Sequence, residues 1–413
     1  MWNTFTKKRI YLDHASATPV LPEALSAMND AEARFANPGS IHSDGVAARA
    51  LLEDSREKIA SEFGVKPRQI VFTSGLTESN NLAILGFARR RELSGARLSG
   101  THWITTSIEH ASVLEVFAEI ERRGGTVTRI MPDERGIIAP EALRAAMRPD
   151  TVFVSIGWGN NEIGSVQDIS ALTRVARAAL TKHPVIFHSD AGQCPLYYSP
   201  QMHTLGVDVL SVGAGKLYGP RSSGVLCVLD PSGFAPVIFG GGQEGGLRAG
   251  TEDVVPSVGF ARALEIIARE RGAEAVRLGK MRDELARALA AKIPGIVFNG
   301  PPVRAGDRKH ALPHMLNVSI PDINSEYLVL ALDAKGFALS TRSACEASAA
   351  RSHVVHALGG PPPVAKWRAS NTLRISLGRD TATSDTKRFA STLAALLKDI
   401  PRAETFVQHR EVR

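Results

Sequence analysis

A lysine in a glycine-rich turn is the residue of this chain best suited to covalent chemistry. Lys216 ends the turn G-A-G-K, residues 213–216, which directly follows an apolar run at residues 207–212. An amine that is partly desolvated has a lowered pKa and reacts readily with aldehydes. Taken alone, Lys216 is better explained as a lysine on an exposed loop than as a reactive amine. Its meaning therefore depends on the residues that the fold places around it.

A second turn is suited to an anion. The stretch T-S-G-L-T-E, residues 73–78, follows a predicted strand at residues 70–72 and begins a predicted helix. Backbone N–H groups at the start of a helix, with the Thr77 hydroxyl beside them, suit a phosphate group. A capped helix start without a ligand explains the same residues, so both interpretations stay open at this point.

Two further polar residues also follow predicted strands. Asp190 lies one strand before the lysine, where its carboxylate could pair with a protonated pyridine nitrogen, and His110 could stack on an aromatic ring. A capping or packing role fits His110 equally well. A lysine, a carboxylate and a phosphate-binding turn are together what pyridoxal phosphate requires of a protein. The combination predicts a pyridoxal-phosphate site with Lys216 as the attachment residue.

These residues can meet only if their strands end at one edge of a sheet. Apolar runs alternate with amphipathic stretches, which predicts an α/β fold with a mostly parallel sheet and helices on both faces. Ligands of such sheets bind beyond the carboxyl ends of the strands. The predicted strands are residues 70–72, 103–107, 126–131, 152–156, 185–188, 207–212 and 225–229, and the predicted helices are residues 78–91, 112–123, 140–147 and 169–180.

The pattern changes near residue 255, where an α+β region of about 140 residues begins, a usual size for a domain. We expect two long helices there, at residues 258–268 and 273–291, and a short helix that begins at about Ser352. The other predicted elements are strands near Val297 and at residues 316–320, 338–340 and 373–377, and helices at residues 326–334 and 384–397.

Composition argues against several classes of protein. The net charge is +7, but the basic residues are scattered over predicted helix surfaces, so we expect no direct binding of nucleic acid. No apolar run reaches the roughly 18–20 residues of a membrane helix, and no secretory signal is evident, which predicts a cytoplasmic protein. The three cysteines form no C-x-x-C pair, so we expect no metal site and no disulfide framework. A G-x-G-x-x-G match at residues 240–245 opens no helical run and predicts no dinucleotide site.

Seven ordered motifs resemble those of the cysteine desulfurases, which belong to the class V aminotransferase-like group of fold-type I pyridoxal-phosphate enzymes. The motifs are Y-L-D at residues 11–13, T-S-G-L-T-E-S at 73–79, N-N-E-I-G at 160–164, K-L-Y-G-P at 216–220, G-L-R-A-G-T at 246–251, S-A-C at 343–345 and R-I-S-L-G-R at 374–379. The resemblance extends over residues 11–397. It implies a large cofactor-binding domain at residues 16–260 with a seven-stranded, mostly parallel sheet, and a smaller α+β domain at residues 1–15 and 261–413.

The resemblance implies roles around the cofactor. Lys216 matches the Schiff-base lysine, Asp190 the carboxylate on the pyridine nitrogen, and His110 the histidine stacked on the ring. Other positions match residues that contact the ring or the phosphate, and in this chain they are Leu76, Thr77, Asn161, Gln193, Gly213 and Gly215. Thr251 matches a phosphate contact that the partner subunit of a homodimer donates.

The resemblance also implies the reaction. Asn161 and Arg374 match the residues that hold the substrate, with Arg374 on its carboxylate, and Cys345 matches the nucleophile that takes the sulfur. L-Cysteine would then yield L-alanine and a persulfide on Cys345, for transfer to an acceptor protein. Iron–sulfur cluster assembly, tRNA thiolation and DNA sulfur modification all use such donors. Residues 346–351 resemble the sulfur-delivery loop of the group I enzymes.

The chain departs from the family pattern close to the lysine. The family has serine at position 213 and histidine at position 215, where this chain has glycine, and His14 and Ser16 replace the usual Asn and Ala. A selenocysteine lyase, a cysteine sulfinate desulfinase or another class V enzyme is an alternative to a cysteine desulfurase. A weakly active sulfur-transfer scaffold is an alternative of a different class, which the two glycines favour.

Overall fold

Seven strands form the main sheet of the computed structural model, which describes residues 9–302, 309–341, 351–358 and 364–399. Their spatial order is β2 (Ile70–Thr73), β8 (Gly224–Val228), β7 (Val209–Gly213), β6 (Ile186–Asp190), β5 (Thr151–Ser155), β3 (His102–Thr106) and β4 (Thr126–Ile130). β8 pairs antiparallel with both neighbours, and the remaining pairs are parallel. The other six strands therefore end at one edge, and the predicted α/β fold with a seven-stranded, mostly parallel sheet is confirmed.

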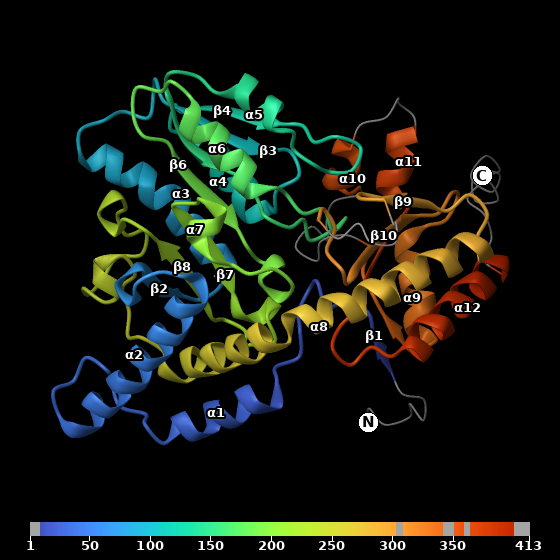
Figure 1. The fold of residues 1–413 in the computed structure, drawn as a ribbon, viewed down its shortest axis with the longest axis horizontal. Helices are drawn as coiled ribbons and strands as arrows, with labels where there is room; N and C mark the ends of the chain where they lie inside the picture. The colour runs from blue at the N-terminus through green and yellow to red at the C-terminus, as the bar shows by residue number, and fades with distance from the viewer. Residues whose placement is uncertain (1–8, 303–308, 342–350, 359–363, 400–413) are drawn as a thin grey trace, which may run out of the picture.

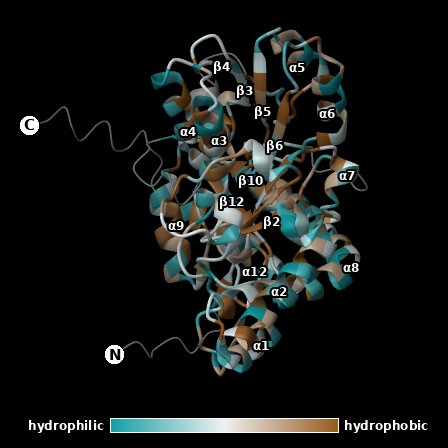
Figure 2. Ribbon diagram, turned by 90° about the vertical axis from the view of Figure 1, so that its left-hand side faces the viewer, coloured by the Kyte–Doolittle hydropathy of each residue, from teal (hydrophilic) through white to brown (hydrophobic). Residues whose placement is uncertain are grey.

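Helices cover both faces of this sheet because the side chains of each strand alternate between them. Trp103 and Phe153 belong to the hydrophobic cluster under α3 (Leu76–Leu93) and α4 (Ala111–Arg122). Their neighbours Ile104 and Val154 belong to the cluster that includes α6 (Ile169–Ala178) and α8 (Val254–Lys292). β3, β5 and β7 are accordingly buried along their whole length, as central parallel strands covered on both faces are. Figure 2 shows apolar strands inside and mixed helices outside.

A smaller body lies beside the large sheet, and α8 runs from one to the other (Figure 1). Its core is an antiparallel sheet of β9 (Val297–Asn299), β10 (Met315–Ser319) and β12 (Thr372–Ser376). The helices here are α9 (Ser325–Ala334), α10 (His353–Ala357), α11 (Val364–Ser370) and α12 (Thr383–Asp399). β1 (Ile10–Tyr11) pairs in parallel with β11 (Phe337–Ala338), so the start of the described chain lies in this body.

The prediction of two helices at residues 258–268 and 273–291 was wrong, because α8 is one continuous helix. Arg271 lies between the two predicted segments, and its Nε donates to the Pro195 carbonyl at 2.9 Å. Its guanidinium also pairs with Glu62 at 2.5 Å. These contacts offset the helix penalty of Gly272, which is about 1 kcal/mol relative to alanine.

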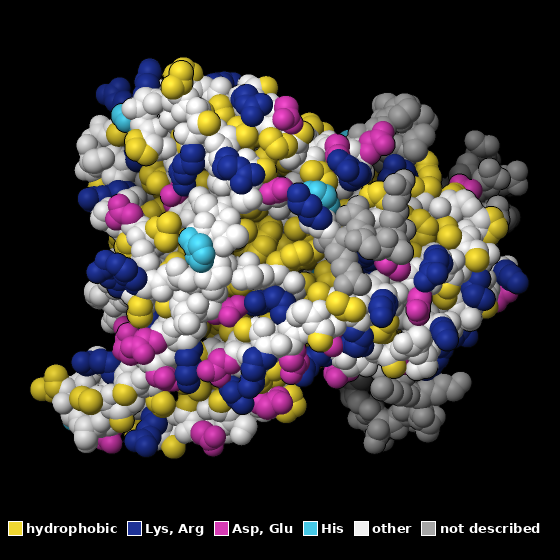
Figure 3. All heavy atoms as spheres, viewed as in Figure 1, with side chains coloured by type: hydrophobic (Ala, Val, Ile, Leu, Met, Phe, Trp, Pro, Cys, Tyr) yellow, Lys and Arg dark blue, Asp and Glu magenta, His cyan; other side chains and the backbone are white. Residues whose placement is uncertain are grey.

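Two helices near the start of the chain were not predicted. They are α1 (Pro22–Glu32) and α2 (Ser43–Phe63), and both pack against α8. The remaining helices of the large body are α5 (Pro140–Ala146) and the single turn α7 (Met202–Leu205). In the described part of the chain, no helix combines the length and the apolarity needed to span a membrane. Figure 3 shows lysine and arginine side chains interspersed with acidic ones on one face of the molecule.

Candidate active site

A cavity of about 380 Å³ opens at the carboxyl edge of the large sheet, a size typical of small-molecule sites. The turns after β2, β3, β5, β6 and β7 line it, together with residues 15–17 and with Arg374 from β12. The predicted site residues that border this cavity are Leu76, Thr77, His110, Asn161, Asp190, Gln193, Gly213, Gly215, Lys216 and Arg374. End-of-strand reasoning named Thr77, His110, Asp190 and Lys216, and the family resemblance named the other six.

Lys216 reaches the cavity from a single 3₁₀ turn that follows β7. Its side chain is half-buried, and its Nζ donates to the carbonyl oxygens of Ala15 at 3.0 Å and Ser16 at 2.5 Å. Gln193, which is buried, donates from Nε2 to the same Ala15 carbonyl at 3.1 Å. The amine is therefore held by carbonyl oxygens of the N-terminal segment at the edge of the cavity.

A buried amide links Asp190 to His110. Asn80, on the inner face of α3, donates from Nδ2 to Asp190 Oδ2 at 2.7 Å and to Ser112 Oγ at 2.9 Å. The other Asp190 oxygen accepts from the Gly192 N–H at 2.9 Å. The Ser112 N–H donates to His110 Nδ1 at 3.1 Å, so a neutral His110 carries its proton on Nε2. Sequence reasoning missed Asn80, which looks like any other polar helix residue.

Glu109 forms part of the cavity wall behind His110 and is buried. Its carboxyl accepts from Thr106 Oγ1 at 2.7 Å and from the Gly157 N–H at 3.1 Å, which ties the end of β3 to the turn after β5. Burial raises the pKa of Glu109 to about 7. The sequence marks it as a strand-end residue beside His110, but its burial follows only from the packing.

Arg374 lies on β12 with its side chain only 1% exposed. Its Nη2 pairs with Asp13 Oδ1 at 2.9 Å and also contacts Ser16 Oγ, and Nη1 donates to the Asn161 carbonyl at 3.0 Å. Its Nε has no hydrogen-bond partner among the described residues. A buried donor without an acceptor costs free energy, so this cavity is suited to an anionic group that supplies one.

The start of α3 faces the same cavity. Gly75 adopts φ +134°, and the N–H groups of Leu76 and Thr77 have no acceptor in the described part of the chain. Glu78, in the first turn, pairs with Arg248 at 2.9 Å. Although burial acts to raise it, hydrogen bonds from Ser74 and Arg248 hold the pKa of Glu78 below its ordinary value. The free N–H groups can receive a phosphate group here.

Cys345 and residues 346–350 lie outside the described residues, but both flanks of that segment contact the cavity walls. On one side, the Arg374 N–H donates to the Ser340 carbonyl at 2.7 Å. On the other side, Ser352 Oγ donates to the buried Glu162 at 2.6 Å, and His353 Nε2 lies 3.0 Å from the Glu109 carbonyl oxygen. Ser352 also caps α10, which begins where the sequence predicted a helix. The described residues on either side of Cys345 are thus joined to Arg374 and Glu109.

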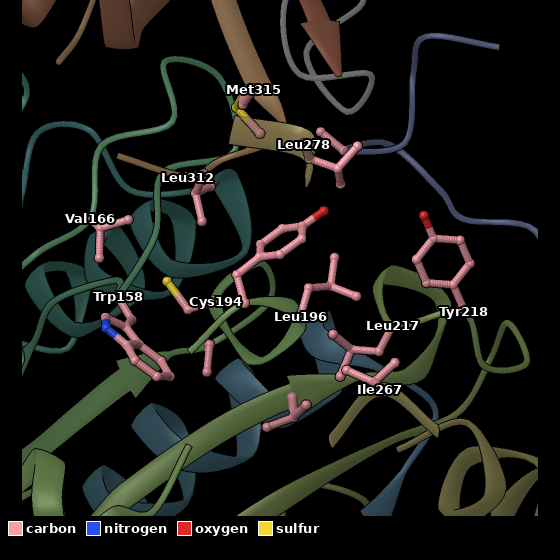
Figure 4. Packing of buried hydrophobic residues seen from close by; sticks show 14 of the residues in the cluster. Trp158, Val166, Cys194, Leu196, Leu217, Tyr218, Ile267, Leu278, Leu312 and Met315 are labelled. Atoms are coloured by element: carbon pink, nitrogen blue, oxygen red, sulfur yellow. The ribbon is translucent and has the colours of Figure 1, made fainter. Parts of the chain in front are cut away.

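The other two cysteines belong to the hydrophobic core. Cys194 and Cys227 are both fully buried, and burial raises the pKa of each thiol well above its ordinary range. Figure 4 shows Cys194 packed near Trp158, Val166 and Leu312. A thiol with a raised pKa forms little thiolate, which is the nucleophilic form. Neither side chain is suited to attack a substrate.

Two residues named in the sequence analysis lie elsewhere. Thr251 is exposed and does not border the cavity of its own chain. His14 points away from the cavity and packs against Tyr11, with its Nδ1 3.2 Å from the Ser376 carbonyl oxygen. The His14 ring requires a glycine at position 378, because a Cβ there would lie 2.0 Å from His14 Nε2.

Comparison with known proteins gives consistent matches. The family model for aminotransferase class-V matches residues 10–389. The cysteine desulfurase IscS of Dictyoglomus turgidum is 35% identical over 408 residues, which cover 98% of this chain and 99% of that protein. A solved NifS-like protein superposes with a TM-score of 0.85 at 32% identity, covering 95% of this chain and all of the other. A structure described as SspA in complex with cysteine has a TM-score of 0.74 at 34% identity, covering 89% of this chain and 98% of the other.

Proposed function

The chain belongs to the class-V aminotransferase family and is a cysteine desulfurase, and we propose that it works with pyridoxal phosphate held on Lys216. The relatives named as cysteine desulfurases are 32–38% identical over nearly the whole chain. The observation that carries the proposal is the meeting of Lys216, Asp190, His110 and the start of α3 around one cavity.

The residues present fit this cofactor. A cavity with an amine, a carboxylate, an imidazole and an open helix start offers one partner to each polar part of pyridoxal phosphate. Asp190 would hold the pyridine nitrogen, Gln193 the ring hydroxyl, and Leu76 and Thr77 the phosphate. When bound, pyridoxal phosphate supplies an aldehyde for the substrate amine and a ring that stabilises negative charge at the substrate Cα.

The side chains of the chain then have separate tasks. Arg374 would hold the substrate carboxylate through its unpartnered Nε, with Asn161 beside it, since a guanidinium binds a carboxylate in a fixed orientation. Lys216 Nζ would hold and move the proton of the substrate Cα. The carbonyl oxygens of Ala15 and Ser16 keep that amine in position. Asn80 orients the Asp190 carboxylate from behind.

Cys345 would take the sulfur. The Cβ–S bond of L-cysteine breaks, an S–S bond forms on Cys345, and the remaining three-carbon fragment takes up protons to give L-alanine. The contacts of Ser340 with Arg374 and of His353 with Glu109 join both described flanks of this segment to the cavity wall, which supports the assignment. We further propose a homodimer, in which the exposed Thr251 reaches the phosphate of the partner's site. We also propose a cytoplasmic location and transfer of the persulfide sulfur to an acceptor protein.

Incubation with L-cysteine and pyridoxal phosphate, with alanine, sulfide and protein persulfide measured together, tests the proposal. We expect K216A to lose alanine release, and C345S to lose both persulfide and alanine release. C227A is the matched control, because it removes a thiol that is buried in the sheet. Mass spectrometry after alkylation places the persulfide on one peptide.

The same assay separates the alternatives. If C345S retains full turnover of L-cysteine, the persulfide route is wrong. Faster turnover of selenocysteine or cysteine sulfinate, unaffected by C345S, would favour those lyase activities. If the protein shows no Schiff-base absorbance band near the visible edge, even with added pyridoxal phosphate, a scaffold without catalytic activity is favoured.

A further inference from the structure

The two glycines before Lys216 change the anion end of the cavity in different ways. A Cβ at Gly213 would lie 2.9 Å from Leu76 Cγ and 3.2 Å from Leu76 Cδ1, so Leu76 fills the place of a side chain at position 213. A Cβ at Gly215 would lie 3.7 Å from both Cα and Cγ of Arg221, which is ordinary contact. The space of a side chain at position 213 is therefore filled by Leu76, and the space of a side chain at position 215 borders Arg221.

Arg221 belongs to the turn that closes back on the start of α3. The Ala214 N–H donates to the Ser223 carbonyl at 2.9 Å, and that carbonyl lies 4.0 Å from a Cβ built on Gly75. Arg221, Ser222 and Ser223 consequently border the same cavity as Thr77 and Lys216. The turn and the helix start therefore both border the space that the phosphate-binding N–H groups face.

No acidic side chain among the described residues pairs with Arg221. Within the described residues, its guanidinium makes no hydrogen bond and no ion pair. By contrast, the nearby Arg248 is paired with Glu78. Arg221 also borders a second hollow with Asp380 and Asp385, yet it forms no ion pair with either of these described carboxylates. It is an exposed cation whose side chain is free to turn toward the cavity.

We propose that Arg221 binds the phosphate group of the bound cofactor and replaces the side-chain donors that Gly213 and Gly215 lack. This inference rests on the proposed function and adds a binding residue to it. A guanidinium suits the task, because its planar set of donors can contact two phosphate oxygens at once. The helix start and Arg221 would then hold the phosphate from two sides.

The test compares two ligands that differ only in the phosphate. Apoprotein is titrated with pyridoxal phosphate and with pyridoxal, and the dissociation constants are read from absorbance. We expect R221Q to weaken pyridoxal phosphate roughly tenfold, as for loss of one charge-assisted contact, and to leave pyridoxal unchanged. R221K should lose less. The matched control is R90Q, which removes an exposed arginine near the other end of α3.

Each outcome has one meaning. An unchanged ratio of the two constants in R221Q, or equal weakening of both ligands, overturns the role of Arg221 while the proposed function stands. The pyridoxal titration also reports whether the variant has kept its fold. Wild-type protein that binds neither ligand would overturn the proposed function and this inference with it. Inorganic phosphate should compete with pyridoxal phosphate less effectively in R221Q than in the wild type.

Discussion

Replacement of Glu109 by glutamine tests whether an ionisable carboxyl is buried in the cavity wall. The pKa of Glu109 is raised by burial from 4.5 to about 7. A carboxyl whose pKa rises on folding binds more protons in the folded chain, so the free energy of unfolding falls as the pH rises between the two values. Calculated from pH 5 to pH 8, this loss is about 2.5 kcal/mol.

The measurement is urea unfolding at fixed protein concentration, from pH 5 to pH 8, for wild type and E109Q. Other groups also titrate in this range. Burial lowers the pKa of four described histidines. The value falls to about 4 for His102 and to about 3 for His188 and His314, and the pKa of His14 is lowered as well. They destabilise the fold as the pH falls below 6.5, but equally in both proteins, so they cancel in the difference.

The difference between the two curves is therefore the quantity to examine. We expect E109Q to gain about 2.5 kcal/mol relative to wild type between pH 5 and pH 8. E115Q, which changes an exposed glutamate of α4, should run parallel to the wild type. If the wild-type and E109Q curves are parallel as well, the Glu109 carboxyl ionises without penalty, and the reasoning from burial is refuted.

Two further predictions concern packing around the cavity. N80A removes the donor to Asp190 and Ser112. Because two buried hydrogen bonds are lost, we expect the free energy of unfolding, measured by urea titration, to fall by about 1–3 kcal/mol. A fall of less than about 0.5 kcal/mol would contradict this. G213A forces a methyl group against Leu76, so it should lower the melting temperature, whereas L76A with G213A should recover part of that loss. Strictly additive effects of the two substitutions would show that they do not share one space.

Much of the site follows from local sequence because the fold is built from consecutive strand and helix units. Residues that directly follow parallel strands must lie at one edge, so Lys216, Asp190 and His110 could be placed together without a structure. The reversed strand β8 does not disturb this, because it contributes no residue of that set.

The contacts that orient the site could not be predicted in the same way. The Asp13–Arg374 pair joins residues that are 361 positions apart, and nothing in either local sequence specifies the other. Asn80 lies inside a helix, where its burial depends on packing against α4 and β6. Likewise, the continuity of α8 depends on contacts of Arg271 with distant residues. Thr251 lies outside the cavity of its own chain, so the role proposed for it would depend on a second subunit.

The carbonyl oxygens that hold Lys216 have a consequence for biosynthesis. They belong to Ala15 and Ser16, and the Ala15 N–H is itself held by Ser376 Oγ at 2.9 Å. Ala15 and Ser16 are translated early, whereas Ser376, which fixes the position of Ala15, is translated 361 residues after Ala15. Lys216 can therefore be held in this arrangement only after residue 376 has been synthesised. A ligand that needs Lys216 in this position meets the complete site only after that point.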